Sequence, residues 1–147
     1  MKVLVSEHAN ARDVRAGRTG FAVMLQQSDI VTLHCPLTDD TRDMFGRSEF
    51  EMMKRNALLI NTARGALVQE DALIHALKNG LIAGAAVDCL REEPPRNGNS
   101  LLDLDLANLI VTPHVAWASD EAVQALADQV IDNIEAFVAG RRQNVLT

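Results

Sequence analysis

Residues 58–67, LLINTARGAL, decide the fold class of this chain. Three apolar residues end on the small polar residues Asn61 and Thr62, and one arginine, Arg64, then stands directly before Gly65. A short apolar run of this kind, bounded by polar residues and glycine, is typical of a buried strand. The long cationic side chain of Arg64 therefore follows the carboxyl end of a predicted strand.

The same pattern recurs along the chain. Short apolar runs that predict strands are KVLVS (2–6), DIVTLH (29–34), ALLINTA (57–63), GAAVDCL (84–90) and NLIVTPH (108–114). Helical patterns lie between them at 21–28, 48–55 and 69–80. The apolar runs hardly alternate, so we expect both sides of each strand to be buried. The sequence predicts an α/β fold, a Rossmann-like parallel sheet with helices on both faces.

The C-terminal part of the chain predicts one long helix over residues 119–140. Ser119 is a helix-capping residue, and acidic residues suit the positive end of the helix that it begins. We interpret the apolar stripe of this helix as core packing; it consists of Val123, Leu126, Val130, Ile134 and Phe137. Residues 91–108 contain two prolines and an Asn-Gly pair, which indicates a loop rather than an interdomain linker.

Composition limits the possible functions. The chain has 147 residues, 14 basic and 20 acidic, and a net charge of −6 with no basic block, which argues against nucleic acid or an anionic membrane as the main partner. No apolar run approaches the roughly 20 residues of a membrane span. Two distant cysteines, Cys35 and Cys89, favour reduced thiols over a disulfide framework. We expect a single cytoplasmic domain whose partners are small molecules or proteins.

Ionisable residues follow three of the predicted strands. Arg64 follows ALLINTA (57–63), Asp88 closes the apolar run GAAV (84–87) with Glu93 five residues later, and His114 follows NLIVTP (108–113). Ligands of open parallel sheets bind at the carboxyl ends of the strands. A guanidinium matches a carboxylate, imidazole transfers protons near neutral pH, and a neighbouring carboxylate holds the imidazole tautomer. Together these groups suit a carbonyl acid as ligand.

Each of these residues also has a simpler explanation. An arginine after a strand is often a surface salt-bridge partner, a histidine before a helix is often a cap or a packing residue, and REEPP (91–95) alone would be a solvated loop. A zinc site formed by His34, Cys35, Cys89 and His114 was also considered. No close ligand pair at zinc-like spacing supports it beyond the adjacent His34 and Cys35, so no metal is expected.

Two segments, 58–95 and 106–117, resemble the D-specific 2-hydroxyacid dehydrogenase family, whose members use NAD(P). The motifs that carry the resemblance are NTARG, Asp88 followed by Glu93-Pro94, and TPH. The resemblance implies that Arg64 binds the carboxylate and carbonyl of the substrate, that His114 donates or accepts the proton, and that Glu93 pairs with His114. Trp117 and the ending 133–147 are most similar to the glycerate dehydrogenase (hydroxypyruvate reductase) branch.

The resemblance also implies a set of cofactor-binding residues. Glu7 stands where KVLVS ends, and an acidic residue at the end of the second Rossmann strand accepts hydrogen bonds from ribose hydroxyls and repels a 2′-phosphate. NAD is therefore favoured over NADP, although a solvated acid would explain Glu7 equally well. The full set of implied contacts is Glu7, Cys35, Pro36, Thr62, Ala63, Arg64, Asp88, His114 and Ala116.

The chain departs from the family at its beginning. It contains no G-x-G-x-x-G, and residue 1 corresponds to the second Rossmann strand, so we expect residues 1–147 to be a partial NAD-binding domain that lacks the first strand, the phosphate loop and the substrate-binding domain. Such a fragment is expected to be inactive alone, and a noncatalytic nucleotide-binding or protein-pairing module is the alternative. We also expect a homo-oligomer, or association with a missing half, through the edge of residues 29–34.

Overall fold

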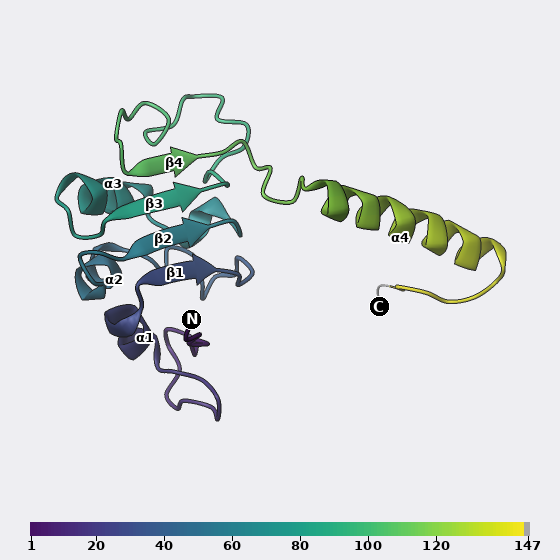
Figure 1. The fold of residues 1–147 in the computed structure, drawn as a ribbon, viewed down its shortest axis with the longest axis horizontal. Helices are drawn as coiled ribbons and strands as arrows, with labels where there is room; N and C mark the ends of the chain where they lie inside the picture. The colour runs from purple at the N-terminus through teal and green to yellow at the C-terminus, as the bar shows by residue number, and fades with distance from the viewer. Residues whose placement is uncertain (146–147) are drawn as a thin grey trace. The chain divides into compact units, whose positions relative to one another are not determined.

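The computed structural model describes residues 1–145, which fall into two compact units that divide after His114. The first unit contains a parallel sheet of four strands in the order β1-β2-β3-β4. The strands are β1 (Ile30–Leu33), β2 (Leu58–Asn61), β3 (Gly84–Val87) and β4 (Leu109–Val111). Figure 1 shows the sheet with its strands side by side. The Rossmann-like α/β fold class is confirmed.

Two helices connect the first three strands. Helix α2 (Arg47–Met52) joins β1 to β2, and helix α3 (Glu70–Lys78) joins β2 to β3, preceded by the short 3₁₀ helix η1 (Gly65–Leu67). Parallel crossovers are right-handed, and both of these advance the sheet in the same direction, so α2 and α3 lie on one face and pack together (Figure 1). Helix α1 (Phe21–Gln27) packs against α2.

The side chains that point toward α2 and α3 form the core. Val31, Leu59 and Ala85 are aligned across the sheet and buried, and Phe45 and Phe50 fill the space below with no exposed surface. On the other face, Ile30 is 51% exposed and Leu58 is 40% exposed. The expectation that both sides of every strand are buried is therefore wrong for β1 and β2, because α2 and α3 cover only one side.

Residues 2–6 do not form a sheet strand, contrary to the sequence-based prediction. Their β pairing within the described chain is one isolated parallel bridge, between Ser6 and Thr19. A strand requires a partner for its backbone groups, and the four-stranded sheet has β1 at its edge rather than next to residues 2–6. Association through that edge stays a prediction.

The second unit contains one long helix, α4 (Asp120–Val138), as expected. Ser119 caps it, since its hydroxyl oxygen accepts a hydrogen bond from the backbone N–H of Ala122. The predicted core stripe is instead exposed, from 45% at Val123 to 83% at Phe137, and Ala136 is the buried residue of this helix. The apolar period correctly predicted the helix, but period alone does not show that a partner covers it. None of the helices in residues 1–145 is both long and apolar enough to cross a membrane.

Gly65 lies where two strand-end loops touch. A Cβ atom at this position would be 2.2 Å from the carbonyl carbon of Leu90 and 2.5 Å from the amide nitrogen of Arg91. Those are backbone atoms, which cannot rotate away as a flexible side chain can. The loop after β2 can therefore approach the loop after β3 only because residue 65 has no side chain.

A salt bridge lies beside this contact. Arg91 donates to both carboxylate oxygens of Asp43, at 2.5 and 3.1 Å, and the backbone N–H of Asp43 donates to the carbonyl of Ala66 at 2.8 Å. The Arg91 guanidinium lowers the pKa of the Asp43 carboxyl. Three segments, the loop before α2, η1 and the loop after β3, are thus connected through Asp43.

We predict that Gly65→Ala destabilises the fold more than an alanine at a roomy glycine. The new methyl group would overlap the Leu90–Arg91 backbone, and overpacking of this kind costs about 1–3 kcal/mol or more. Gly20→Ala is the matched control, because its Cβ would meet only the Val14 side chain at an ordinary 3.5 Å. Urea unfolding of both variants measures the difference, and equal midpoints would contradict the close approach.

We predict that Asp43→Asn reduces stability near neutral pH but not in acid. A carboxyl whose pKa is lowered by folding stabilises the protein above its unfolded pKa, about 3.9, and this contribution is lost as the pH falls through the lower folded value. The pair is partly exposed, so the difference should stay below about 1 kcal/mol. Thermal unfolding at several pH values tests this. A difference between wild type and variant that is the same at pH 7 and pH 3 would contradict it.

Candidate functional site

The loop after β2 is fixed by a buried asparagine. The side-chain amide of Asn61 donates to the carbonyl of Arg64 at 2.9 Å, and its oxygen accepts from the backbone N–H of Ala63 at 3.1 Å. The asparagine itself is only 1% exposed. Residues 62–64 are thereby held in one conformation at the carboxyl end of β2, where Thr62 and Arg64 are exposed. One guanidinium nitrogen of Arg64 donates to the carbonyl of Ala63 at 2.6 Å.

The loop after β3 presents Glu93 to His114. One oxygen of the Glu93 carboxylate accepts from the backbone N–H of Leu90 at 2.7 Å, and the other lies 2.7 Å from Nδ1 of His114. An ionised carboxylate can only accept, so Nδ1 of the imidazole carries the proton of this contact. The predicted Glu93–His114 pair is confirmed as a contact.

His114 has an unusual backbone conformation. Its φ angle is +57°, in the left-handed region that residues with a side chain seldom adopt. The residue follows β4 by way of Thr112 and Pro113, and its backbone N–H donates to the carbonyl of Thr112 at 3.0 Å. Residues in sparsely populated backbone conformations cluster at functional sites.

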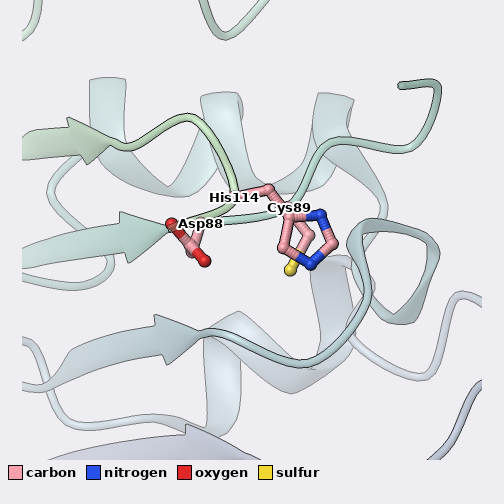
Figure 2. A group of neighbouring side chains, drawn as sticks. All are labelled: Asp88, Cys89 and His114. Carbon is pink, nitrogen blue, oxygen red and sulfur yellow. The ribbon is translucent and has the colours of Figure 1, made fainter. Parts of the chain in front are cut away.

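Asp88 and Cys89 are buried and lie close to His114. Asp88, at the end of β3, accepts a hydrogen bond from the hydroxyl of Thr112, and its backbone N–H donates to the carbonyl of Asn61 at 2.9 Å. Burial raises the pKa of the Cys89 thiol, Glu93 and Asp88 raise it further, and Arg64 lowers it. Figure 2 shows Asp88, Cys89 and His114 gathered at this end of the sheet. One ligand-type atom from each residue lies within 4.8 Å of the others.

The strand-end residues are therefore brought to one edge, as the sequence predicted. Arg64 comes from the loop after β2, Asp88 and Glu93 from the loop after β3, and His114 from the loop after β4. Glu93 is hydrogen-bonded to His114, and both Asp88 and His114 lie near Cys89. Arg64 is close enough to lower the pKa of the Cys89 thiol. The edge combines a cation that can bind a carboxylate with an imidazole that a carboxylate orients.

The predicted cofactor residue Glu7 has a partner that the sequence did not reveal. Its buried carboxylate accepts from Nε and a terminal nitrogen of Arg15, at 2.7 and 2.5 Å, and from the backbone N–H groups of His8 and Arg15. These bonds, led by the Arg15 guanidinium, lower the pKa of Glu7 far below its ordinary value. Because a carboxylate has about four acceptor positions, ribose hydroxyls can bind Glu7 only if Arg15 moves away.

The other predicted cofactor residues lie at several places. Burial raises the pKa of the Cys35 thiol, whose sulfur lies 3.7 Å from that of Met44, and the carbonyl of Pro36 accepts from the Thr41 hydroxyl at 2.7 Å. Thr62 and Ala63 belong to the loop after β2, beside Arg64. Ala116 belongs to the second unit.

Sequence reasoning missed four residues that shape this edge: Asn61, Thr112, Cys89 and Arg15. Asn61 and Thr112 were seen only as parts of motifs, yet both are polar residues at a buried strand end, where an unsatisfied group is costly. Cys89 was considered only as a reduced thiol and as one of four candidate zinc ligands. Arg15 lies eight residues from Glu7 with no periodic pattern between them, so no signal indicated their contact.

Comparison with known proteins agrees with this geometry. Residues 1–116 match the family model described as D-isomer specific 2-hydroxyacid dehydrogenase, NAD binding domain. Over 130 residues the chain is 60% identical to glycerate dehydrogenase of Methylorubrum extorquens, covering 88% of this chain and 41% of that protein. It is 43% identical over 128 residues to glyoxylate reductase of Thermococcus litoralis, covering 87% of this chain and 38% of that protein.

Solved structures of known proteins are also similar to this chain. The crystal structure of D-lactate dehydrogenase with NAD⁺ from Lactobacillus jensenii superimposes with a TM-score of 0.80 at 32% identity, covering 99% of this chain and 48% of that one. The chain thus spans less than half the length of these relatives. By its family match, its relatives and its fold, the chain belongs to the D-isomer specific 2-hydroxyacid dehydrogenase family, through the NAD binding domain.

Proposed function

We propose that this chain supplies the cofactor side and the proton-transfer residues of an NAD-dependent oxidoreductase that acts on the CH–OH group of a small D-2-hydroxy acid, with glycerate and hydroxypyruvate favoured. The observation that carries the proposal is the Glu93–His114 pair at the same sheet edge as Arg64. The similarity to glycerate dehydrogenase supports the choice of substrate.

In the reducing direction, Arg64 binds the carboxylate of a 2-keto acid and stabilises the negative charge that develops on the carbonyl oxygen. Glu93 holds the imidazole by Nδ1, so that Nε2 of His114 delivers the proton to that oxygen. A bound NADH would supply a hydride to the carbonyl carbon, which together with this proton would convert the ketone to the alcohol. Glu93 orients His114 and does not itself react.

The residues at the edge fit such a cofactor on its nicotinamide side. The carbonyl of Ala63 and the carboxylate of Asp88 are groups of the acceptor type that a carboxamide needs, and exposed Thr62 precedes Ala63 in the same loop. On the adenosine side, Glu7 requires Arg15 to move before it can accept ribose hydroxyls. Cys35 and Pro36 complete the proposed contacts within the first unit.

A protein-pairing module is the second candidate. Ile30, Leu58 and Ile110 lie exposed on the sheet face opposite α2 and α3, and the apolar stripe of α4 is exposed as well. Large exposed apolar residues in such numbers favour a partner, either a second copy of this chain or the remaining half of a dehydrogenase. Such a partner is compatible with the oxidoreductase, because a substrate-binding domain would also have to cover part of this chain.

We predict that the isolated chain does not reduce hydroxypyruvate with NADH, and that joining it to the N-terminal half of a relative restores turnover. Closure of a second domain is what excludes water from the reacting carbonyl. In the joined enzyme, His114→Gln should lower kcat about 10²–10⁴-fold, the usual contribution of a general acid. NADH oxidation measured by absorbance tests this.

His75→Gln serves as the control, because this histidine lies on α3 and pairs with Asn79. Its kcat should equal that of the unsubstituted joined enzyme. Turnover that survives His114→Gln would remove the oxidoreductase role of this edge and leave the pairing module. NADH oxidation by the isolated chain that depends on His114 would show that no second domain is needed.

We predict that the joined enzyme prefers NADH to NADPH because the Glu7 carboxylate repels a 2′-phosphate. Glu7→Gln removes the charge and should reduce the NADH/NADPH ratio of kcat/KM by about tenfold, equivalent to about 1.4 kcal/mol. Glu51→Gln, an exposed acid on α2, is the control and should leave the ratio unchanged. Equal efficiencies with both cofactors in the unsubstituted enzyme, or a preference for NADPH, would contradict the role of Glu7.

A further inference from the structure

The loop between β3 and β4 contains an Asn-Gly pair, Asn97–Gly98, that neither the proposed reaction nor the family assignment uses. We propose that this pair is a site of spontaneous deamidation, at which Asn97 is converted to aspartate or isoaspartate. Both residues are exposed, and the space around the Cα atom of Gly98 is open. Because glycine has no side chain, nothing on Gly98 itself hinders the approach of the Asn97 side chain to its backbone nitrogen.

The reaction uses the side chain of Asn97, the backbone nitrogen of Gly98 and one water molecule. After losing its proton to a base, the Gly98 nitrogen attacks the Cγ carbon of Asn97 and a carbon–nitrogen bond forms. The side-chain amide takes up a proton and leaves as ammonia. Water then opens the resulting succinimide ring at either carbonyl, which yields aspartate or isoaspartate. No oxidant or reductant takes part, and either product adds one carboxylate, which is ionised near neutral pH.

A second Asn-Gly pair, Asn79–Gly80 at the end of α3, serves as an internal comparison. It too is exposed, and both glycines have positive φ angles, +80° at Gly98 and +62° at Gly80. Their backbone N–H groups are also bonded alike, that of Gly98 to the carbonyl of Pro95 at 3.2 Å and that of Gly80 to the carbonyl of Leu77 at 3.4 Å. Exposure, glycine conformation and the bonding of the attacking nitrogen therefore do not separate the two pairs.

The asparagine side chains do separate them. The side-chain amide of Asn79 donates to the carbonyl of His75 at 2.8 Å and lies 3.3 Å from Nδ1 of the same residue. These contacts have to break before the Asn79 side chain can turn toward the next nitrogen. Among residues 1–145, the side chain of Asn97 has no hydrogen-bond partner, so it turns without that cost. The fold thus protects one pair and leaves the other reactive.

Asn99, two residues further along the same loop, is held in place. Its side-chain amide donates to both carboxylate oxygens of Glu70, at 3.0 and 3.1 Å, and its side-chain oxygen accepts from the backbone N–H of Leu101 at 2.8 Å. It is also followed by Ser100, whose side chain hinders approach to the backbone nitrogen more than glycine does. We therefore assign the reaction to Asn97 and not to Asn99.

Deamidation changes both the charge and the backbone of the loop that carries Glu93. An isoaspartate adds one carbon atom to the main chain at residue 97, between Glu93 and the anchored Asn99. The new carboxylate also enters an acidic environment, because Asn97 lines an open hollow of about 440 Å³ together with three acidic residues, Glu70, Glu92 and Asp103. The modification therefore alters a loop that positions part of the sheet edge, without any change at the edge itself.

Ageing of the folded chain near neutral pH, followed by mass spectrometry, tests the site. Cleavage before aspartate residues yields fragments 71–87 and 88–102 from one digest, so each Asn-Gly pair lies in its own fragment. The aspartate product adds a cleavage point before position 97 and the isoaspartate product does not, so both are counted. We expect deamidation of 88–102 to be about tenfold faster than that of 71–87, or more, equivalent to about 1.4 kcal/mol in the barrier. Equal rates, a faster change in 71–87, or no change in 88–102 would overturn the proposal.

Unfolding in guanidinium chloride provides the control for the role of the fold. Both pairs are Asn-Gly, so their rates should become similar once the contacts of Asn79 with His75 are lost. A difference between the fragments that is as large in the unfolded chain as in the folded one would mean that the neighbouring sequence sets the rates. That outcome would refute the structural argument.

Two glutamine variants locate the reacting residue. Asn97→Gln should leave fragment 88–102 unmodified, because attack on the longer side chain requires a less favourable six-membered ring. Asn79→Gln is the matched control and should leave the rate at Asn97 unchanged. Modification that persists in Asn97→Gln would place it at Asn99 and refute the assignment. These measurements use neither NADH nor a keto acid, so their outcome is independent of the proposed oxidoreductase function.

Discussion

The close approach of two backbones at Gly65 is the constraint on which the edge of the sheet depends. The loop after β2 passes the Leu90–Arg91 peptide so closely that even a methyl group would overlap it. This explains why the longest cationic side chain of the edge stands next to the smallest residue. Gly65 brings the loop against its neighbour, and Arg64, one position earlier, is exposed at the strand end. A larger residue at position 65 would separate the loop of Arg64 from the loop of Glu93.

Around that contact, polar side chains form the hydrogen bonds that neighbouring strands form within the sheet. The loops after β2 and β3 have no ladder to satisfy their backbone groups, so the side chains of Asn61 and Glu93 form hydrogen bonds with those groups instead. The Glu93 carboxylate both fixes its own loop, through Leu90, and orients His114. The Glu93 carboxylate therefore has both a structural role and a role in the proposed chemistry, and a substitution at Glu93 would alter both.

The apolar pattern predicted strands correctly where another strand pairs with the segment and wrongly where none does. Residues 58–61 and 84–87 were found from their apolar pattern because neighbouring strands pair with them. Residues 2–6 have an equally apolar pattern, yet they form only one bridge, since pairing depends on residues far along the chain. The prediction that the apolar stripe of α4 packs in the core was wrong for the same reason. Periodicity identifies an amphipathic helix, whereas its cover is a property of another segment or chain.

The residues of the candidate site were likewise predictable only in part. Arg64, Glu93 and His114 could be placed at one edge because the carboxyl ends of parallel strands always meet there. Asn61 and Thr112 act through side-chain hydrogen bonds whose geometry no spacing specifies. Arg15 reaches Glu7 through a loop of irregular conformation, so a sequence-based assignment of Glu7 to the ribose lacked the group that competes for its oxygens.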